Sequence, residues 1–318
     1  MFTAAFLAAG FAILVKGADL LVEGAVSLAR RLGVSDLVVG LTVVSFGTSC
    51  PELFVSLLAS ARGNPDIAMG NVLGSNIANV LLVLGASAAV RPLAVSRSAV
   101  AWEIPASLFA SLLLWDMASD TTSPDAPGLS RGDGLVLLGF LAIFLLRSYS
   151  ASRGGEPPAD MPAAPAHGLA RSFLMVATGL VFLALGGHFI VDSAVKIAYW
   201  AGMPESVVGL TVVAVGTSLP EMATSVTAAL RGMSDIAVGN VVGSNLFNIL
   251  LILGVSAVVR PLPFNPANHP DLAVMAGSNA LLLAFLALGG KRGLGGREGA
   301  VFLILYGGYI AYLLAFHR

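Results

Sequence analysis

Two glutamates, Glu52 and Glu221, stand inside long apolar stretches, and each directly follows a proline. A single carboxylate in hydrocarbon is costly, so such residues usually face a polar cavity and mark a functional site. The prolines, Pro51 and Pro220, lack an N–H and clash with the carbonyl group four residues earlier, so each helix must kink or break there. Irregular backbone at membrane depth is tolerated where it lines a cavity. We therefore predict a polar cavity beside both glutamates.

Hydroxyl and amide side chains accompany the glutamates at a spacing of four residues, which places each set on one helix face. The set around the glutamates contains Thr48, Ser56, Thr217 and Ser225. A second set, further along each half, contains Asn71, Ser75, Asn79, Asn240, Ser244 and Asn248. No lysine or arginine interrupts these four apolar stretches. We therefore expect the carboxylates to serve a ligand rather than a buried ion pair.

Together these residues offer carboxylate, hydroxyl, amide and backbone carbonyl oxygens, with no thiolate or imidazole at the same spacing. Hard cations such as Ca²⁺ take roughly six to eight oxygen ligands, whereas Zn²⁺ and copper ions prefer histidine or cysteine. Two carboxylates neutralise one divalent ion, and the same oxygens could instead be divided among several Na⁺ ions. Competition between two ions, and therefore ion exchange, follows as a hypothesis.

The chain has 318 residues, of which 57% are hydrophobic and only 11% are charged. Soluble domains carry roughly 25% charged residues, so the composition predicts a polytopic protein of the lipid bilayer and excludes a soluble enzyme or a nucleic-acid-binding protein. The net charge of −1 indicates no particular partner, and the one cysteine, Cys50, excludes an intrachain disulfide. The motifs H-E-x-x-H and G-x-S-x-G do not occur, so no enzymatic activity is expected.

Apolar runs bounded by turn residues predict ten membrane-spanning helices, each of which needs roughly 20 residues. They cover residues 2–28, 35–61, 66–90, 98–117, 133–147, 171–197, 203–230, 235–259, 271–289 and 299–316. The first run lacks a basic leading segment and is longer than a signal-peptide core, so we expect it to be retained as a helix. We predict an all-α polytopic fold with two five-helix halves, residues 1–147 and 171–318. They are joined by a linker, residues 148–170, that is rich in proline, glycine and alanine.

The two halves are copies of one another. Residues 40–93 align without a gap with residues 209–262, and 34 of the 54 aligned residues are identical. Five spans per half is an odd number, so the second copy must be inverted. Eleven basic residues fall in loops on one side and five on the other, which predicts a cytoplasmic linker and both termini outside the inner membrane. Inverted repeats are typical of transporters, with the binding site at midplane between the repeats.

The paired segments Gly-Thr-Ser-x-Pro-Glu and Gly-Asn-Val-x-Gly-Ser-Asn-x-x-Asn resemble the signature repeats of the calcium/cation antiporter superfamily, in particular its prokaryotic sodium/calcium exchanger branch. The resemblance extends over all ten predicted spans and the linker. It implies alternating access, with Na⁺ entry driving Ca²⁺ extrusion, so that both ions are substrates and no cofactor or obligatory protein partner is expected. It also implies that the ions are bound by the carbonyl groups of Ser45 and Ala214 and by Thr48, Ser49, Glu52, Ser75, Asn79, Thr217, Ser218, Glu221, Ser244 and Asn248.

Asn248 departs from the family pattern, because some members carry aspartate there, and this leaves the ion stoichiometry open. Coupling of Ca²⁺ to H⁺ or K⁺ on the same fold is the main alternative, although proton-coupled relatives usually differ in the Gly-Thr-Ser-x-Pro-Glu segment. A passive channel would gain nothing from an enclosed site with two carboxylates. An intramembrane enzyme would need a nucleophile and a base, and no such pair is evident.

Charged residues near the end of the first run have a less specific interpretation. Lys16, Asp19 and Glu23 crowd this end, and His188 and Asp192 stand at the positions equivalent to Asp19 and Glu23 in the second half. We expect them to form local ion pairs or to extend to the membrane surface rather than to line an ion path.

Overall fold

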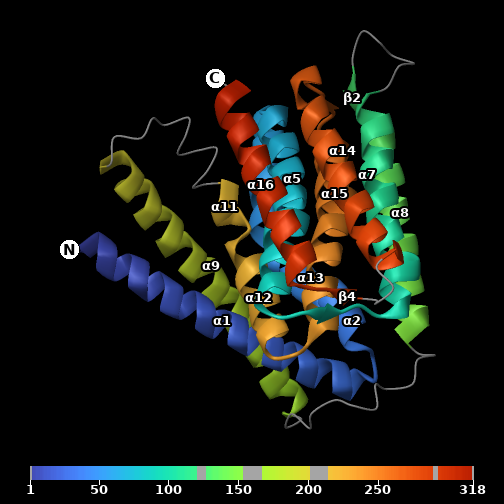
Figure 1. Ribbon diagram of the computed structural model, residues 1–318. Helices are drawn as coiled ribbons and strands as arrows, with labels where there is room; N and C mark the ends of the chain where they lie inside the picture. The colour runs from blue at the N-terminus through green and yellow to red at the C-terminus, as the bar shows by residue number, and fades with distance from the viewer. Residues whose placement is uncertain (1, 120–126, 153–166, 201–213, 289–292, 317–318) are drawn as a thin grey trace.

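The computed structural model describes residues 2–119, 127–152, 167–200, 214–288 and 293–316 and is drawn in Figure 1. The α-helices are α1 (Phe2–Leu32), α2 (Asp36–Val39), α3 (Ser45–Thr48), α4 (Cys50–Arg62), α5 (Pro65–Ala78), α6 (Gly85–Val90), α7 (Ile104–Ala118), α8 (Arg131–Ser152), α9 (Leu169–Trp200), α11 (Ala214–Thr217), α12 (Leu219–Leu230), α13 (Ser234–Leu246), α14 (Gly254–Val259), α15 (His269–Leu288) and α16 (Gly296–Phe316). The π-helical segments are η1 (Gly40–Val44), η2 (Asn79–Leu84), η3 (Ala99–Glu103) and η5 (Phe247–Leu253), and η6 (Pro266–Asn268) is a 3-10 turn. The strands are β1 (Leu93–Ala94), β2 (Gly128–Leu129), β3 (Leu262–Pro263) and β4 (Gly293–Leu294).

The protein is helical and crosses the membrane several times. In the described part of the chain, eight helical stretches are long and apolar enough to span a bilayer. A ninth candidate consists of residues 36–48 and 50–62, two helical pieces bent by 49°. All nine overlap predicted spans, whereas the predicted seventh span, 203–230, lies partly outside the described residues. The four two-residue strands were not predicted, and they pair only as the short ribbons β1–β4 and β2–β3.

Helices α1 and α9 lie side by side along much of their length and cross the remaining helices obliquely (Figure 1). Glycines allow this close contact, because small residues let helix backbones approach one another in a membrane. A Cβ atom on Gly17 would lie 2.8 Å from the backbone nitrogen of Leu183 and 2.9 Å from the carbonyl oxygen of Gly179. A Cβ on Gly179 would in turn lie 2.7 Å from the nitrogen of Leu21. Larger residues at these positions would separate the two helices.

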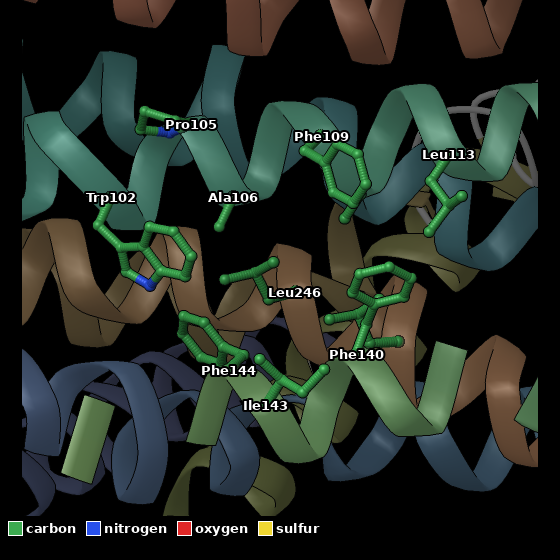
Figure 2. A pocket seen from close by; sticks show the side chains of 11 residues that line it. Trp102, Pro105, Ala106, Phe109, Leu113, Phe140, Ile143, Phe144 and Leu246 are labelled. Atoms are coloured by element: carbon green, nitrogen blue, oxygen red, sulfur yellow. The ribbon is translucent and has the colours of Figure 1, made fainter. Parts of the chain in front are cut away.

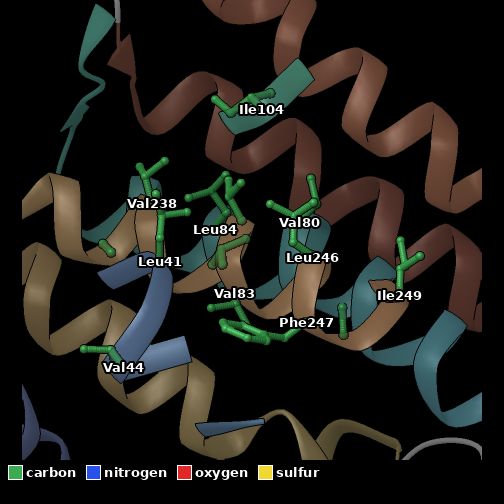
Figure 3. Packing of buried hydrophobic residues seen from close by; sticks show 14 of the residues in the cluster. Leu41, Val44, Val80, Val83, Leu84, Ile104, Val238, Leu246, Phe247 and Ile249 are labelled. Carbon is green, nitrogen blue, oxygen red and sulfur yellow. The ribbon is translucent and has the colours of Figure 1, made fainter. Parts of the chain in front are cut away.

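The two spans that carry the second polar set form the centre of the molecule. In the most apolar 18-residue stretch of each span, 72% of the residues are buried for Pro65–Val90 and 83% for Ser234–Val259. In the other six long apolar helices of the described chain, 44% or less of the residues are buried. Figure 3 shows Val80 and Val83 from the first span beside Leu246 and Phe247 from the second. The polar residues on these spans are therefore enclosed by protein rather than by lipid.

The duplication seen in the sequence recurs in local structure. The π-helical segments η2 and η5 occupy equivalent positions, and each is followed by a six-residue helix, α6 or α14, that ends in an extended arginine. Strands β1 and β3 are also equivalent, and each pairs with a strand from the other half. Wide π-helical turns occur mostly within α-helices and often at functional sites.

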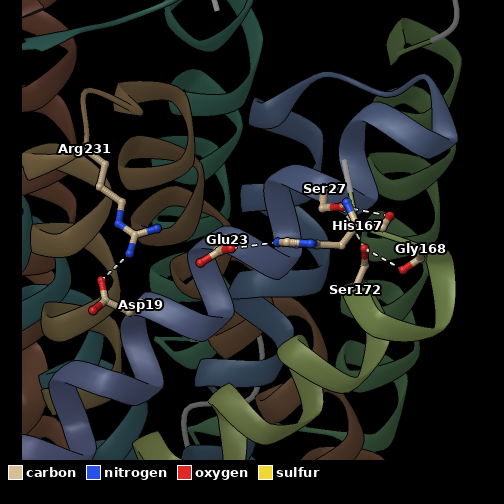
Figure 4. A network of polar contacts seen from close by, with 7 residues as sticks. All are labelled: Asp19, Glu23, Ser27, His167, Gly168, Ser172 and Arg231. Atoms are coloured by element: carbon tan, nitrogen blue, oxygen red, sulfur yellow. Dashed lines mark hydrogen bonds and ion pairs between the residues drawn. The ribbon is translucent and has the colours of Figure 1, made fainter. Parts of the chain in front are cut away.

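Two carboxylates in the C-terminal half of α1 have local polar partners, and one of them, Asp19, forms an ion pair, as the sequence predicted (Figure 4). Asp19 Oδ1 lies 2.5 Å from Arg231 Nη2. Glu23 Oε1 lies 2.7 Å from His167 Nε2, and the hydroxyl of Ser27 accepts the backbone N–H of His167 at 2.9 Å. These contacts attach α1 to residues near the start of α9 and after α12, so the charges serve local structure.

Candidate functional site

The helix breaks between α3 and α4 and, in the second half, between α11 and α12. Ser49 has φ −85° and ψ 4° at the first break, and Ser218 has φ −87° and ψ 6° at the second. Pro51 and Pro220 each lie in the first turn of the helix that follows, where a missing N–H is tolerated. The two predicted helix breaks are therefore confirmed, and they have the same geometry.

The breaks place both glutamates at the N-terminal ends of helices. Glu52 lies in the first turn of α4 and Glu221 in the first turn of α12, where the partial positive charge of the helix end stabilises a carboxylate. Each glutamate is only 1% exposed. Within the described residues, neither carboxylate forms an ion pair with a basic side chain, and the Oε2 atom of each has no hydrogen-bond partner. The protein thus encloses two carboxylates without a matching positive side chain.

An asparagine from the following helix connects the two polar sets within each half. Asn71 Nδ2 donates to the carbonyl oxygen of Glu52 at 3.2 Å and to Ser56 Oγ at 2.9 Å. Asn240 Nδ2 makes the same two contacts in the second half, at 3.4 Å to the glutamate carbonyl and 2.9 Å to Ser225 Oγ. The two sets that share a spacing of four residues therefore meet in space.

Two hydroxyl groups at the first break extend to the second half of the chain. Ser49 Oγ donates to Glu221 Oε1 at 3.3 Å, and Thr48 Oγ1 donates to Asn240 Oδ1 at 3.1 Å. Polar motifs that are 169 residues apart in the sequence consequently belong to one buried cluster.

Four buried asparagines extend the cluster on α5–η2 and α13–η5. Asn79 Nδ2 donates to Asn245 Oδ1 at 3.1 Å, and Asn248 Nδ2 donates to Asn76 Oδ1 at 3.0 Å. The sequence predicts Asn79 and Asn248 as ligands but does not single out Asn76 and Asn245, because these two do not share the four-residue spacing. The duplication could have identified them, because both are the asparagine of the Gly-Ser-Asn segment that is repeated in the two halves.

Comparison with known proteins identifies the family. The sodium/calcium exchanger protein family matches residues 2–150 and 171–315. The chain belongs to this family. It is 38% identical over 321 residues to the inner membrane protein YrbG of Escherichia coli, covering 97% of this chain and 95% of YrbG. It is 31% identical to the sodium/calcium exchanger MaX1 of Methanosarcina acetivorans, with 96% of both chains covered. The solved structure of the sodium-calcium exchanger NCX_Mj soaked with zero Na⁺ and Ca²⁺ is 33% identical and aligns with a TM-score of 0.83 over 98% of both chains.

The structure buries most of the residues that the exchanger family implies as ligands. Ten of the twelve are at most 3% exposed, namely Ser45, Thr48, Ser49, Glu52, Ser75, Asn79, Ser218, Glu221, Ser244 and Asn248. Thr217 is half-buried, and Ala214, whose backbone alone is described, begins α11. The carbonyl oxygen of Ser45 accepts a hydrogen bond from Ser49 N at 3.0 Å. Thr48 Oγ1, which has one hydrogen to donate, lies 3.3 Å from this carbonyl oxygen and 3.1 Å from Asn240 Oδ1. The Ser45 carbonyl, which the family resemblance implies as an ion ligand, is therefore engaged within the helix.

Six of these residues carry a buried oxygen atom with no hydrogen-bond partner in the described part of the exchanger chain. These atoms are Glu52 Oε2, Asn79 Oδ1, Ser218 Oγ, Glu221 Oε2, Ser244 Oγ and Asn248 Oδ1. Buried polar atoms normally have a partner, and a set of carboxylate, amide and hydroxyl oxygens is what a hard cation prefers. No cluster of three His, Cys, Asp or Glu side chains occurs among the described residues, so a cation here would depend on two carboxylates and neutral oxygens.

Of two cavities in the described structure, one borders this family site and the other shares none of its residues. One, of about 420 Å³, is bordered by α3, α4, α9 and α12 and reaches Thr48 beside the first helix break. The other, of about 300 Å³, is lined by aromatic and aliphatic side chains, among them Trp102, Phe109, Phe140 and Leu246 (Figure 2). Because its walls offer almost no oxygen atoms, the second cavity is unsuited to a cation.

Proposed function

We propose that this protein is a secondary antiporter that exchanges Na⁺ for Ca²⁺ by alternating access, with Na⁺ entry driving Ca²⁺ extrusion. The observation that carries the proposal is the pair of buried carboxylates, Glu52 and Glu221, in one cluster of oxygen atoms. Two negative charges match one Ca²⁺, and the same oxygens can serve several Na⁺ ions. The names of MaX1 and NCX_Mj as sodium/calcium exchangers support this choice of ions. Such a transporter needs no cofactor and catalyses no covalent reaction.

We assign ion binding to the carboxylates together with the hydroxyl, amide and carbonyl groups around them. The proposed ligands are Ser45, Thr48, Ser49, Glu52, Ser75, Asn79, Ala214, Thr217, Ser218, Glu221, Ser244 and Asn248. Ser45 would contribute its carbonyl oxygen, which accepts the N–H of Ser49 and has a second lone pair for the ion.

We further propose that ten spans form two inverted repeats, residues 1–147 and 171–318, joined by a cytoplasmic linker at 148–170. Matched π-helices, matched helix breaks and the family match to both halves support the duplication. The odd number of spans per half and the excess of basic residues on the linker side support the inversion, with both termini outside. The name of YrbG as an inner membrane protein agrees with a location in that membrane.

A K⁺-dependent exchanger of the same fold is the second candidate. Human sodium/potassium/calcium exchanger 4 is 39% identical over 85 residues, although this covers only 26% of the chain. The proposed Na⁺/Ca²⁺ coupling requires no K⁺ and no proton gradient.

Uptake of ⁴⁵Ca²⁺ into proteoliposomes loaded with Na⁺ tests the proposal. We expect uptake when an outward Na⁺ gradient is imposed and none when Na⁺ is replaced by choline. A requirement for K⁺ would favour the second candidate, and uptake driven by a pH gradient alone would favour Ca²⁺/H⁺ exchange. Absence of uptake under all three conditions would refute cation antiport.

A further inference from the structure

Asn76 and Asn245 occupy equivalent positions in the two halves, and each accepts a hydrogen bond from the opposite half. Asn248 Nδ2 donates to Asn76 Oδ1 at 3.0 Å, and Asn79 Nδ2 donates to Asn245 Oδ1 at 3.1 Å. All four side chains are at most 1% exposed. The same contact is therefore built twice, and each copy joins α5–η2 to α13–η5.

These hydrogen bonds fix which way the two proposed ligand amides point. A primary amide carries its donors on one arm and its acceptor on the other. Because the NH₂ arm of Asn79 is bound to Asn245, the Oδ1 atom of Asn79 is directed away from that contact, and the same holds for Asn248 and Asn76. Both ligand Oδ1 atoms are buried without a hydrogen-bond partner among the described residues. A cation is attracted by the amide oxygen and repelled by the NH₂ arm, so this orientation decides whether the amide can act as a ligand.

We propose that Asn76 and Asn245 are positioning residues, each of which orients the ligand amide of the opposite half so that its oxygen faces the cation. The inference rests on the proposed function, since it concerns how Asn79 and Asn248 meet the ion. Asn76 and Asn245 act through the amides that they orient, whose NH₂ groups their Oδ1 atoms accept. Each half of the site is thus completed by a side chain from the other half.

Asn245 offers the cleaner test of this role. Its Nδ2 atom has no hydrogen-bond partner in the described part of the chain, so Asn245→Leu, which keeps the shape of the side chain, removes one side-chain hydrogen bond. Asn76 Nδ2 also lies 3.4 Å from the carbonyl oxygen of Asn245 and 3.6 Å from Met275 Sδ. Asn76→Leu would therefore lose several contacts at once.

The test is a double-mutant cycle on Ca²⁺ affinity, measured by titration calorimetry on the purified full-length protein. We expect Asn245→Leu to weaken Ca²⁺ binding roughly tenfold, since a buried amide without its partner loses its fixed orientation. In an Asn79→Ala background, where there is no ligand amide to orient, Asn245→Leu should cause no further loss. In an Asn248→Ala background, where Asn79 is intact, the tenfold loss should return. Asn245→Asp keeps an acceptor oxygen at this position and should restore at least native affinity.

Equal losses in the Asn79→Ala and Asn248→Ala backgrounds would show that Asn245 supports packing alone, and this would overturn the positioning role. If Asn245→Leu does not give a single folded species in gel filtration, the mirrored cycle of Asn76→Leu with Asn248→Ala carries the same test. The proposed function fails separately, because the native protein would then bind no Ca²⁺ before any replacement is made.

Discussion

Replacement of Glu221 by glutamine removes one of the two negative charges at the candidate site and keeps the size of the side chain. Glu221 is 1% exposed, so solvent does not screen the loss, and breaking a buried charge pair costs about 3–5 kcal/mol. At about 1.4 kcal/mol per factor of ten, Ca²⁺ binding should weaken by roughly 100- to 4,000-fold. We therefore expect Glu221→Gln to abolish Ca²⁺ uptake driven by Na⁺ in proteoliposomes.

Thermal unfolding of the purified variant separates this loss of binding from misfolding. In ion-free buffer, Glu221→Gln should be at least as stable as the native protein, because a buried charge without a counter-charge has been removed. Ca²⁺ at about 100 times its native dissociation constant should stabilise the native protein by about 2.7 kcal/mol. The same concentration should stabilise the variant by about 0.4 kcal/mol or less, given the weaker binding.

Glu103→Gln is the matched control. Glu103 is 3% exposed and accepts a hydrogen bond from Ser98 Oγ at 2.9 Å, but it lies in η3 outside both motifs. This variant should keep both the stabilisation by Ca²⁺ and the exchange activity. Transport by Glu221→Gln at a near-native rate would refute the idea that its charge neutralises Ca²⁺.

Three further perturbations address packing, ligand charge and voltage. Gly17→Ala would place a Cβ 2.8 Å from a backbone nitrogen of α9 and should lower the free energy of unfolding by about 1–3 kcal/mol. As the control, Gly187→Ala should leave thermal unfolding unchanged, because no neighbouring atom lies within 4 Å of its added Cβ. Asn248→Asp adds a third carboxyl group and should change the Na⁺ or pH dependence of exchange more than the maximal Ca²⁺ transport; identical profiles would exclude this position from the site. Exchange of about three Na⁺ per Ca²⁺ moves one charge per cycle, worth about 2.3 kcal/mol per 100 mV, so an inside-negative potential set with valinomycin and K⁺ should accelerate Ca²⁺ extrusion. Transport that is indifferent to voltage would indicate an electroneutral ratio.

The elements that position the site could be predicted from the sequence because they depend on local chemistry. A proline cannot continue an α-helix without a kink or a break at the carbonyl four residues earlier, and a break precedes each of the two prolines. The spacing of four residues that links Glu52 to Ser56 is a property of one helix. Asn71 belongs to the second set, whose spacing is likewise a property of one helix. Its contact with Ser56 therefore required only that the two adjacent helices, α4 and α5, pack together.

Contacts between the two halves could not be predicted in this way. Helical periodicity says which residues share a face, but it does not say which faces of two distant segments meet. The hydrogen bond from Ser49 to Glu221 depends on how the first helix break lies against α12. Those of Asn76 and Asn245 depend on how α5 and α13 are arranged. The carbonyl of Ser45, which the family resemblance implies as an ion ligand, accepts the N–H of Ser49 because the break occurs at Ser49, after Ser45 has completed its turn.

The uncompensated carboxylates also give a physical reason why the proposed site would exchange ions instead of returning empty. A change of access requires an arrangement in which the site is closed to water on both sides. With Ca²⁺ bound, two positive charges offset Glu52 and Glu221, and the site can be enclosed at low cost. Without an ion, the two buried carboxylates could be enclosed only as unpaired charges, at a cost of several kcal/mol for each, or after each has taken up a proton. The N-terminal ends of α4 and α12 offset only part of this, since such interactions contribute at most about 2 kcal/mol. In the proposed exchanger, the charge of the two carboxylates therefore favours a return step with a cation bound over a return with the site empty.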